Sequence, residues 1–122
     1  MFALLACAGC GKGSTAHWIE QLKAADSRTR IEVVHTLQER KTDAAEVVPA
    51  LTATLQDDNT YVRRDAARAL GSFGAEATSA IPALQAARRD REPSVRKAAD
   101  IALSRIDPQF GNSSPMRQGR GK

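Results

Sequence analysis

The chain has few of the side chains on which catalytic and metal sites commonly depend. Cys7 and Cys10 are its only cysteines, so the 112 residues that follow hold no thiol nucleophile and no second cysteine pair for zinc. His17 and His35 are its only histidines. No serine has a plausible base near it in the sequence. We therefore predict that the protein is not an enzyme and has no cofactor and no metal.

Aromatic residues are also few, and the excess of positive charge is small. Phe, Trp and Tyr make up 4% of the chain, which is typical of a helical array with a core of Leu, Val and Ala. The 18 Lys and Arg outnumber the 14 Asp and Glu by four, an excess that lies in Lys12, Arg117, Arg120 and Lys122. Residues 14–108 are therefore neutral, whereas nucleic-acid binding needs a patch of one sign. We expect no nucleic-acid partner.

A period of 33 residues is what the sequence does contain. Arg30, Arg63 and Arg96 mark the same point in three successive copies, which cover about 14–40, 41–73 and 74–107. Apolar positions keep the same phase: Trp18, Leu51 and Leu84; Val33, Ala66 and Ala99; Leu37, Leu70 and Leu103. Because the pattern places these positions inside, Trp18 is expected in the core.

Each copy has the apolar spacing of two amphipathic helices. The break between them is predicted at Asp26, Asn59 and Glu92, where a polar side chain can accept hydrogen bonds from the free N–H groups of the second helix. Pro49 and Pro82 are expected at the end of a first turn, where the missing N–H costs nothing. Gly71 and Gly74 are candidates for a left-handed residue that ends a helix. These features predict an all-α fold, a short α-solenoid of about three helix pairs.

The string from Leu55 to Gly71 resembles a HEAT repeat, of the bacterial HEAT-like type first described in phycobilisome lyases. The third copy matches it and the first is weaker, so the likeness covers about three quarters of the chain. It implies a ladder of charge pairs between copies, formed by Asp57, Arg63, Asp90 and Arg96. Neither histidine is followed by Glu, so the paired His-Glu iron ligands of the HEAT-fold deoxyhypusine hydroxylases are missing.

The outward face of the second helices is where the copies stop agreeing. Charge and size vary there between aligned positions, and in stacked repeats these helices line one concave surface. The predicted partner-binding residues are Glu32, His35, Arg64, Asp65, Arg68, Lys97 and Ile101. We predict a non-enzymatic protein–protein interaction module or scaffold that uses this face.

Both ends of the chain differ from the repeats. Residues 1–13 are mostly apolar and resemble the end of a bacterial lipoprotein signal, which implies lipidation at Cys10, or alternatively Cys7, and a scaffold anchored at the cell envelope. No Lys or Arg precedes the short apolar stretch, so either the true start lies upstream, which we favour, or the signal does not function. Residues 108–122 are expected to form a disordered basic tail. Arg88, which replaces Leu22 and Leu55, is expected to cap the C-terminal side.

An alternative function follows from the family resemblance. It is that of an accessory subunit of a lyase or modifying enzyme, similar to the phycobilisome lyases, in a soluble and cytoplasmic protein. Both hypotheses require a protein partner, whose identity the sequence does not give.

Overall fold

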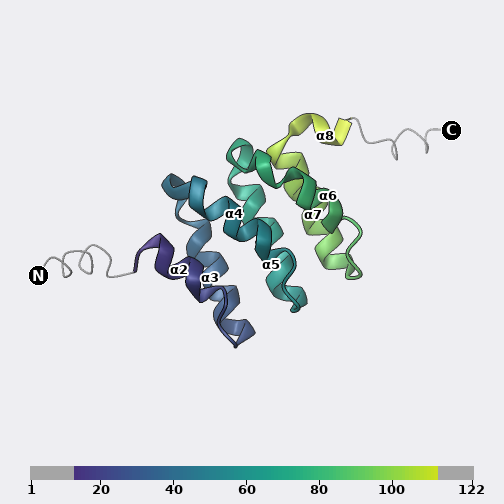
Figure 1. The fold of residues 1–122 in the computed structure, drawn as a ribbon. Helices are drawn as coiled ribbons and strands as arrows, with labels where there is room; N and C mark the ends of the chain where they lie inside the picture. The colour runs from purple at the N-terminus through teal and green to yellow at the C-terminus, as the bar shows by residue number, and fades with distance from the viewer. Residues whose placement is uncertain (1–12, 113–122) are drawn as a thin grey trace, which may run out of the picture.

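The computed structural model describes residues 13–112, and within that range the chain forms helices and no strands. Three helix pairs follow one another along the chain (Figure 1). The first pair is α2 (Thr15–Gln21) and α3 (Ser27–Gln38), and the second is α4 (Ala44–Thr54) and α5 (Thr60–Ser72), with a short 3-10 turn η1 (Lys41–Asp43) before α4. The third is α6 (Ile81–Ala87) and α7 (Pro93–Ile106), with η2 (Gly74–Ala80) before it and α8 (Pro108–Asn112) after it.

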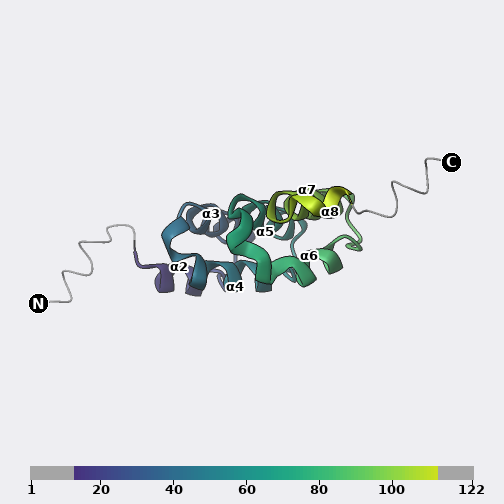
Figure 2. The ribbon, with the colours of Figure 1, turned by 90° about the horizontal axis from the view of Figure 1, so that it is seen from above.

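The pairs stack side by side in two layers. Figure 2 shows α2, α4 and α6 in one layer and α3, α5, α7 and α8 in the other. Helix α5 packs against both α3 and α7 and against its own partner α4. This arrangement confirms the predicted all-α solenoid of about three helix pairs.

Each second helix begins directly after the residue at which the period predicted the break. The Asp26 side chain accepts a hydrogen bond from the Thr29 N–H, and Asn59 accepts from two backbone N–H groups of α5. Glu92 takes the same extended backbone conformation but makes no side-chain capping bond. Pro93 follows it at the first helical position, where no N–H needs a partner.

Two expectations about helix ends are corrected by the structure. Pro49 lies inside α4, because the helix begins at Ala44 and follows directly on η1, so the proline is beyond the first turn. Gly71 is helical and lies against α7, where an added Cβ would stand 3.0 Å from the Ala102 Cα. Gly74, with a φ of +59°, is the residue in the left-handed conformation. The glycine at 71 therefore permits close helix packing, and the glycine at 74 permits the turn.

One apolar core runs through all three pairs. Its largest fully buried side chains include one leucine from each of five helices: Leu37, Leu51, Leu70, Leu84 and Leu103. Burying such a side chain contributes about 1.5–3 kcal/mol to folding. Trp18 is only half-buried at the edge of this core, because the first pair has a neighbouring pair on one side alone. The prediction that it faces the core is thus correct in direction, and its burial is partial.

The C-terminal side of the array is closed by charged and aromatic side chains. Arg88 Nε lies 2.8 Å from Asp100 Oδ1, and its guanidinium lies over the Phe110 ring of α8. Asp100 aligns with Ala67, which is fully buried against the next pair. The expected tail from 108 onward therefore begins with a helix, because Phe110 has the α7 surface to pack on. Residues 113–122 of that tail lie outside the described residues. So do residues 1–12, which include Cys7 and Cys10.

Candidate functional site

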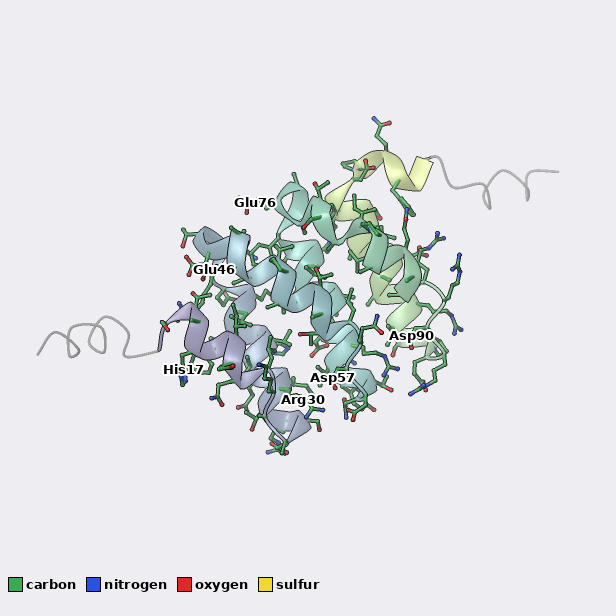
Figure 3. All side chains as sticks on the ribbon, in the orientation of Figure 1. His17, Arg30, Glu46, Asp57, Glu76 and Asp90 are labelled. Carbon is green, nitrogen blue, oxygen red and sulfur yellow. The ribbon has the colours of Figure 1, made fainter. Side chains whose placement is uncertain are left out.

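The repeated arginines form charge pairs between adjacent helix pairs. Arg30 reaches Asp57 with Nε to Oδ2 at 2.8 Å and Nη2 to Oδ1 at 3.0 Å, and Figure 3 shows these two side chains close together. Arg63 makes the same two bonds to Asp90, at 2.9 and 3.0 Å. Bidentate bonds of this kind fix the relative position of two segments as well as attracting them.

A further bond holds each arginine against the loop inside its own helix pair. Nη1 of Arg63 donates to the Asp57 carbonyl at 2.9 Å, and Nη1 of Arg96 donates to the Asp90 carbonyl at 2.8 Å. Arg96 is exposed and has no carboxylate partner among the residues described. Of the residues predicted for the ladder, Asp57, Arg63 and Asp90 thus lie in pairs between repeats. Arg30 is the partner of Asp57. Arg96, also predicted for the ladder, forms no such pair within residues 13–112.

Arg30 and Asp90 have shifted pKa values in these pairs. The hydrogen bonds to Asp57 raise the pKa of Arg30 above its ordinary value. Burial works to raise the pKa of Asp90, but the hydrogen bonds from Arg63 and from the Glu92 N–H outweigh it and lower that pKa below 3.8. Each shift favours the charged form of its group, so both pairs are held as ion pairs that join adjacent repeats.

The outward side of α3, α5 and α7, which we call the second-helix face, carries two hollows. The hollow between α5 and α7 has a volume of about 350 Å³, and its lining includes Arg64, Arg68, Lys97, Ile101 and Arg105. The hollow between α3 and α5 has a volume of about 430 Å³, and its lining includes His35, Glu39 and Asp65. Arg64, Arg68 and Arg105 line both, so the two hollows adjoin.

Asp65 differs from the expectation that it is exposed on this face. Its side chain is only 8% exposed, because Arg64 and His35 cover it. Arg64 Nε donates to Oδ1 at 2.8 Å, and His35 Nε2 lies 3.0 Å from Oδ2. The carboxylate therefore compensates the charge of Arg64 and joins α3 to α5, and it is not available to a partner.

Of the other predicted residues of the face, Arg64 is half-buried and the rest are exposed. Arg68 and Lys97 are in the α5–α7 hollow and have no ion pair among the residues described, and Ile101 beside them is 46% exposed. Glu32 is exposed on α3 but lines neither hollow. Sequence reasoning missed Arg105, an exposed cation in both hollows. The signal was present, because Arg105 aligns with Glu39 and Ser72 and so belongs to another position that varies between copies.

Two kinds of site are not found in residues 13–112. No group of three or more His, Cys, Asp or Glu side chains there is placed to hold a metal ion. None of the helices described is both long enough and apolar enough to cross a membrane.

Comparison with known proteins identifies the fold family. The family profile described as HEAT repeats matches residues 15–104. The chain belongs to the HEAT repeat family. No curated protein matches the sequence.

The solved structures that are similar to this HEAT protein include the following two. The complex of CpcE and CpcF of phycocyanin lyase from Nostoc sp. PCC7120 superposes with a TM-score of 0.68 and 28% identity over 76% of this chain and 37% of that one. Human deoxyhypusine hydroxylase in complex with glycerol gives a TM-score of 0.66 and 31% identity over 77% of this chain and 32% of that one. The HEAT chain thus spans about a third of the length of each.

These likenesses overturn the prediction that the protein is not an enzyme. That prediction is wrong, because one similar structure is a subunit of a lyase and the other is a hydroxylase, and the comparison favours an enzyme-related function. The physical reason for the error is that scarce Cys and His exclude only the chemistry those side chains perform. A helical array can serve an enzyme by holding a protein, which needs neither residue.

Proposed function

We propose that this HEAT protein is a protein-binding accessory subunit of a modifying enzyme and holds its partner on the second-helix face. The observation that carries the proposal is the pair of adjoining hollows along that face. The exposed residues that line them differ between copies, whereas aligned core positions of the same helices, such as Leu37, Leu70 and Leu103, are apolar in every copy. A surface freed from the constraints of the repeat can be adapted to one partner.

The link to an enzyme is supported by the likeness to the phycocyanin lyase structure, which is a complex of CpcE and CpcF. Because this chain spans 37% of that one, the likeness covers the helix pairs and not the whole protein. The activity of the assembly and the identity of the partner are therefore parts of the proposal. HEAT arrays with different functions share this fold, so the function has to be argued from the face.

Affinity capture with the full chain from its host tests the proposal. We expect one protein to be retained in proportion to the bait, together with an enzyme that modifies a protein. A variant with Arg68→Glu and Arg105→Glu should lose that protein. Arg64 is left in place, since it holds the buried Asp65 and its replacement would disturb the fold.

A matched control separates binding from a general effect of charge. The Lys23→Glu and Arg89→Glu variant makes the same change in net charge at exposed residues that line neither hollow. It should retain the partner. Loss of the partner from both variants, or from neither, would rule out the second-helix face as the binding surface.

We propose as a second candidate a scaffold held at the bacterial cell envelope by a lipid on Cys10, or alternatively Cys7. The support is the run of apolar and small residues around these two cysteines. A single lipid anchor would tether the array to a membrane while leaving its face in solution. Fractionation discriminates the two candidates: release by detergent from membranes favours the scaffold, and recovery in the soluble fraction favours the accessory subunit. Mass spectrometry that finds an unmodified Met1 on most molecules would end the lipid proposal.

A further inference from the structure

We infer that the α5–α7 hollow binds an acidic peptide segment of the partner, which inserts an apolar side chain between basic residues. This inference rests on the proposed function and names the chemistry that the second-helix face recognises. It concerns the α5–α7 hollow, whose lining has no Asp or Glu. The α3–α5 hollow shares Arg64, Arg68 and Arg105 with it but is also lined by Glu39 and Asp65.

The charge of the hollow has one sign. Arg64, Arg68, Lys97 and Arg105 line it, and no Asp or Glu does. Arg64 is compensated by Asp65 beneath it, but no ion pair to Arg68, Lys97 or Arg105 is found among residues 13–112. Three uncompensated cations around about 350 Å³ create a positive local potential that attracts an anion, although the described region as a whole is neutral.

The floor of the hollow is apolar. It is made by Gly71, Ala98 and Ala102, which are buried, and Ile101 stands beside them with 46% of its surface exposed. Gly71 deepens this floor, because it has no side chain where α5 meets α7. A floor of this kind suits an aliphatic or aromatic side chain, and contact with it would remove Ile101 from water.

A second exposed hydrophobic residue extends the same surface. Tyr61 is 57% exposed and lies near the start of α5, with the Arg64 guanidinium 5.3 Å from the centre of its ring. Tyr61 and Ile101 are the two large hydrophobic side chains exposed in the part of the chain that the structure describes. Aromatic residues and arginines in such positions are enriched at the centres of protein interfaces.

A nucleic acid fits these features less well than a peptide. A polynucleotide needs cations in a continuous stripe, but the adjoining α3–α5 hollow is lined by Glu39 and Asp65 and interrupts the stripe. A phosphate backbone also gains nothing from an apolar floor. A peptide with carboxylates flanking one apolar residue uses both the basic rim and the floor.

The test uses the full chain and three fluorescent probes. The first is a short peptide with Glu on both sides of a central Leu, the second has Gln in place of Glu, and the third is single-stranded DNA of similar length. Fluorescence anisotropy should show that the acidic peptide binds and that the Gln peptide and the DNA bind at least about tenfold more weakly. Affinity for the acidic peptide should fall by a similar factor in the Arg68→Glu and Arg105→Glu variant and remain unchanged in the Lys23→Glu and Arg89→Glu control.

Several results would overturn the inference. One is the absence of binding by the acidic peptide, and another is an affinity that the Arg68→Glu and Arg105→Glu variant does not change. DNA binding as tight as peptide binding would assign the hollow to polyanions instead. The proposed function is tested separately by capture from the host. If the acidic peptide does not bind but the Arg68→Glu and Arg105→Glu variant still loses the captured protein, the second-helix face stands and the acidic segment is refuted.

Discussion

Arg63 and Arg68 stand five positions apart on α5 and belong to two regions with opposite properties. Arg63 lies in the seam between helix pairs, with its side chain 6% exposed and bound to Asp90 as Arg30 is bound to Asp57. Arg68 lies on the second-helix face, is exposed and aligns with His35 and Ile101. Within α5, the arginine that is repeated in every copy makes a structural contact, whereas the arginine that changes between copies is left exposed for recognition.

The largest effect is expected from breaking the seam. Arg63→Ala leaves Asp90 nearly buried without its partner, so it should lower the free energy of unfolding by roughly 3–5 kcal/mol. Arg96→Ala is the matched control, because Arg96 is at the same position of the next copy but exposed and without a carboxylate. Its cost should stay within about 0.5 kcal/mol. Equal losses in urea denaturation would show that burial of the pair does not matter.

A smaller effect is expected where the seam is tightest. Gly71→Ala places a Cβ 3.0 Å from the Ala102 Cα and 3.2 Å from its Cβ, so α5 and α7 must move apart. The cost should be about 1–3 kcal/mol in denaturation experiments. If the variant is as stable as the parent chain, Gly71 is not the contact that sets this helix spacing.

The seam should also weaken in acid. The pKa of Asp90 is lower in the folded chain than its ordinary 3.8, so its contribution to stability is present above pH 3.8 and is lost as the pH falls through the folded value. Thermal unfolding at a series of acidic pH values should therefore show a weaker pH dependence for Asp90→Asn than for the parent chain. Parallel curves for the two proteins would place the acid sensitivity elsewhere.

The smallest effect on stability is expected from the second-helix face. Arg68→Ala removes an exposed side chain without an ion pair in the described residues, so the free energy of unfolding should change by less than about 0.5 kcal/mol. Partner binding should nevertheless weaken. A loss of stability as large as that of Arg63→Ala would erase the distinction between the two regions.

The period of the sequence was enough to predict the fold and much of the seam. Asp26, Asn59 and Glu92 precede the second helices because local spacing and capping chemistry decide where a helix begins. The period does not say how deeply a side chain is covered by its neighbours. Asp65 was therefore expected to be exposed, although Arg64 and His35 bury it.

The errors at the ends and on the face have similar causes. Phe110 orders the start of the expected tail because α7 offers a surface to it, a tertiary contact that composition does not reveal. Gly71 has the same residue type as Gly74, and only the packing of α5 on α7 distinguishes their roles. Arg105 completes the basic hollow from the last turn of α7, and its place beside Arg64 and Arg68 depends on how α7 packs against α5.

The most direct measurement is photo-crosslinking from a single position on each side of the array. A photoreactive phenylalanine analogue in place of the exposed Ile101 on α7 should form a covalent product with one protein in the host. The same analogue in place of Ala86, exposed on α6 in the other layer, should not. A product from Ala86 and none from Ile101 would contradict binding at the second-helix face.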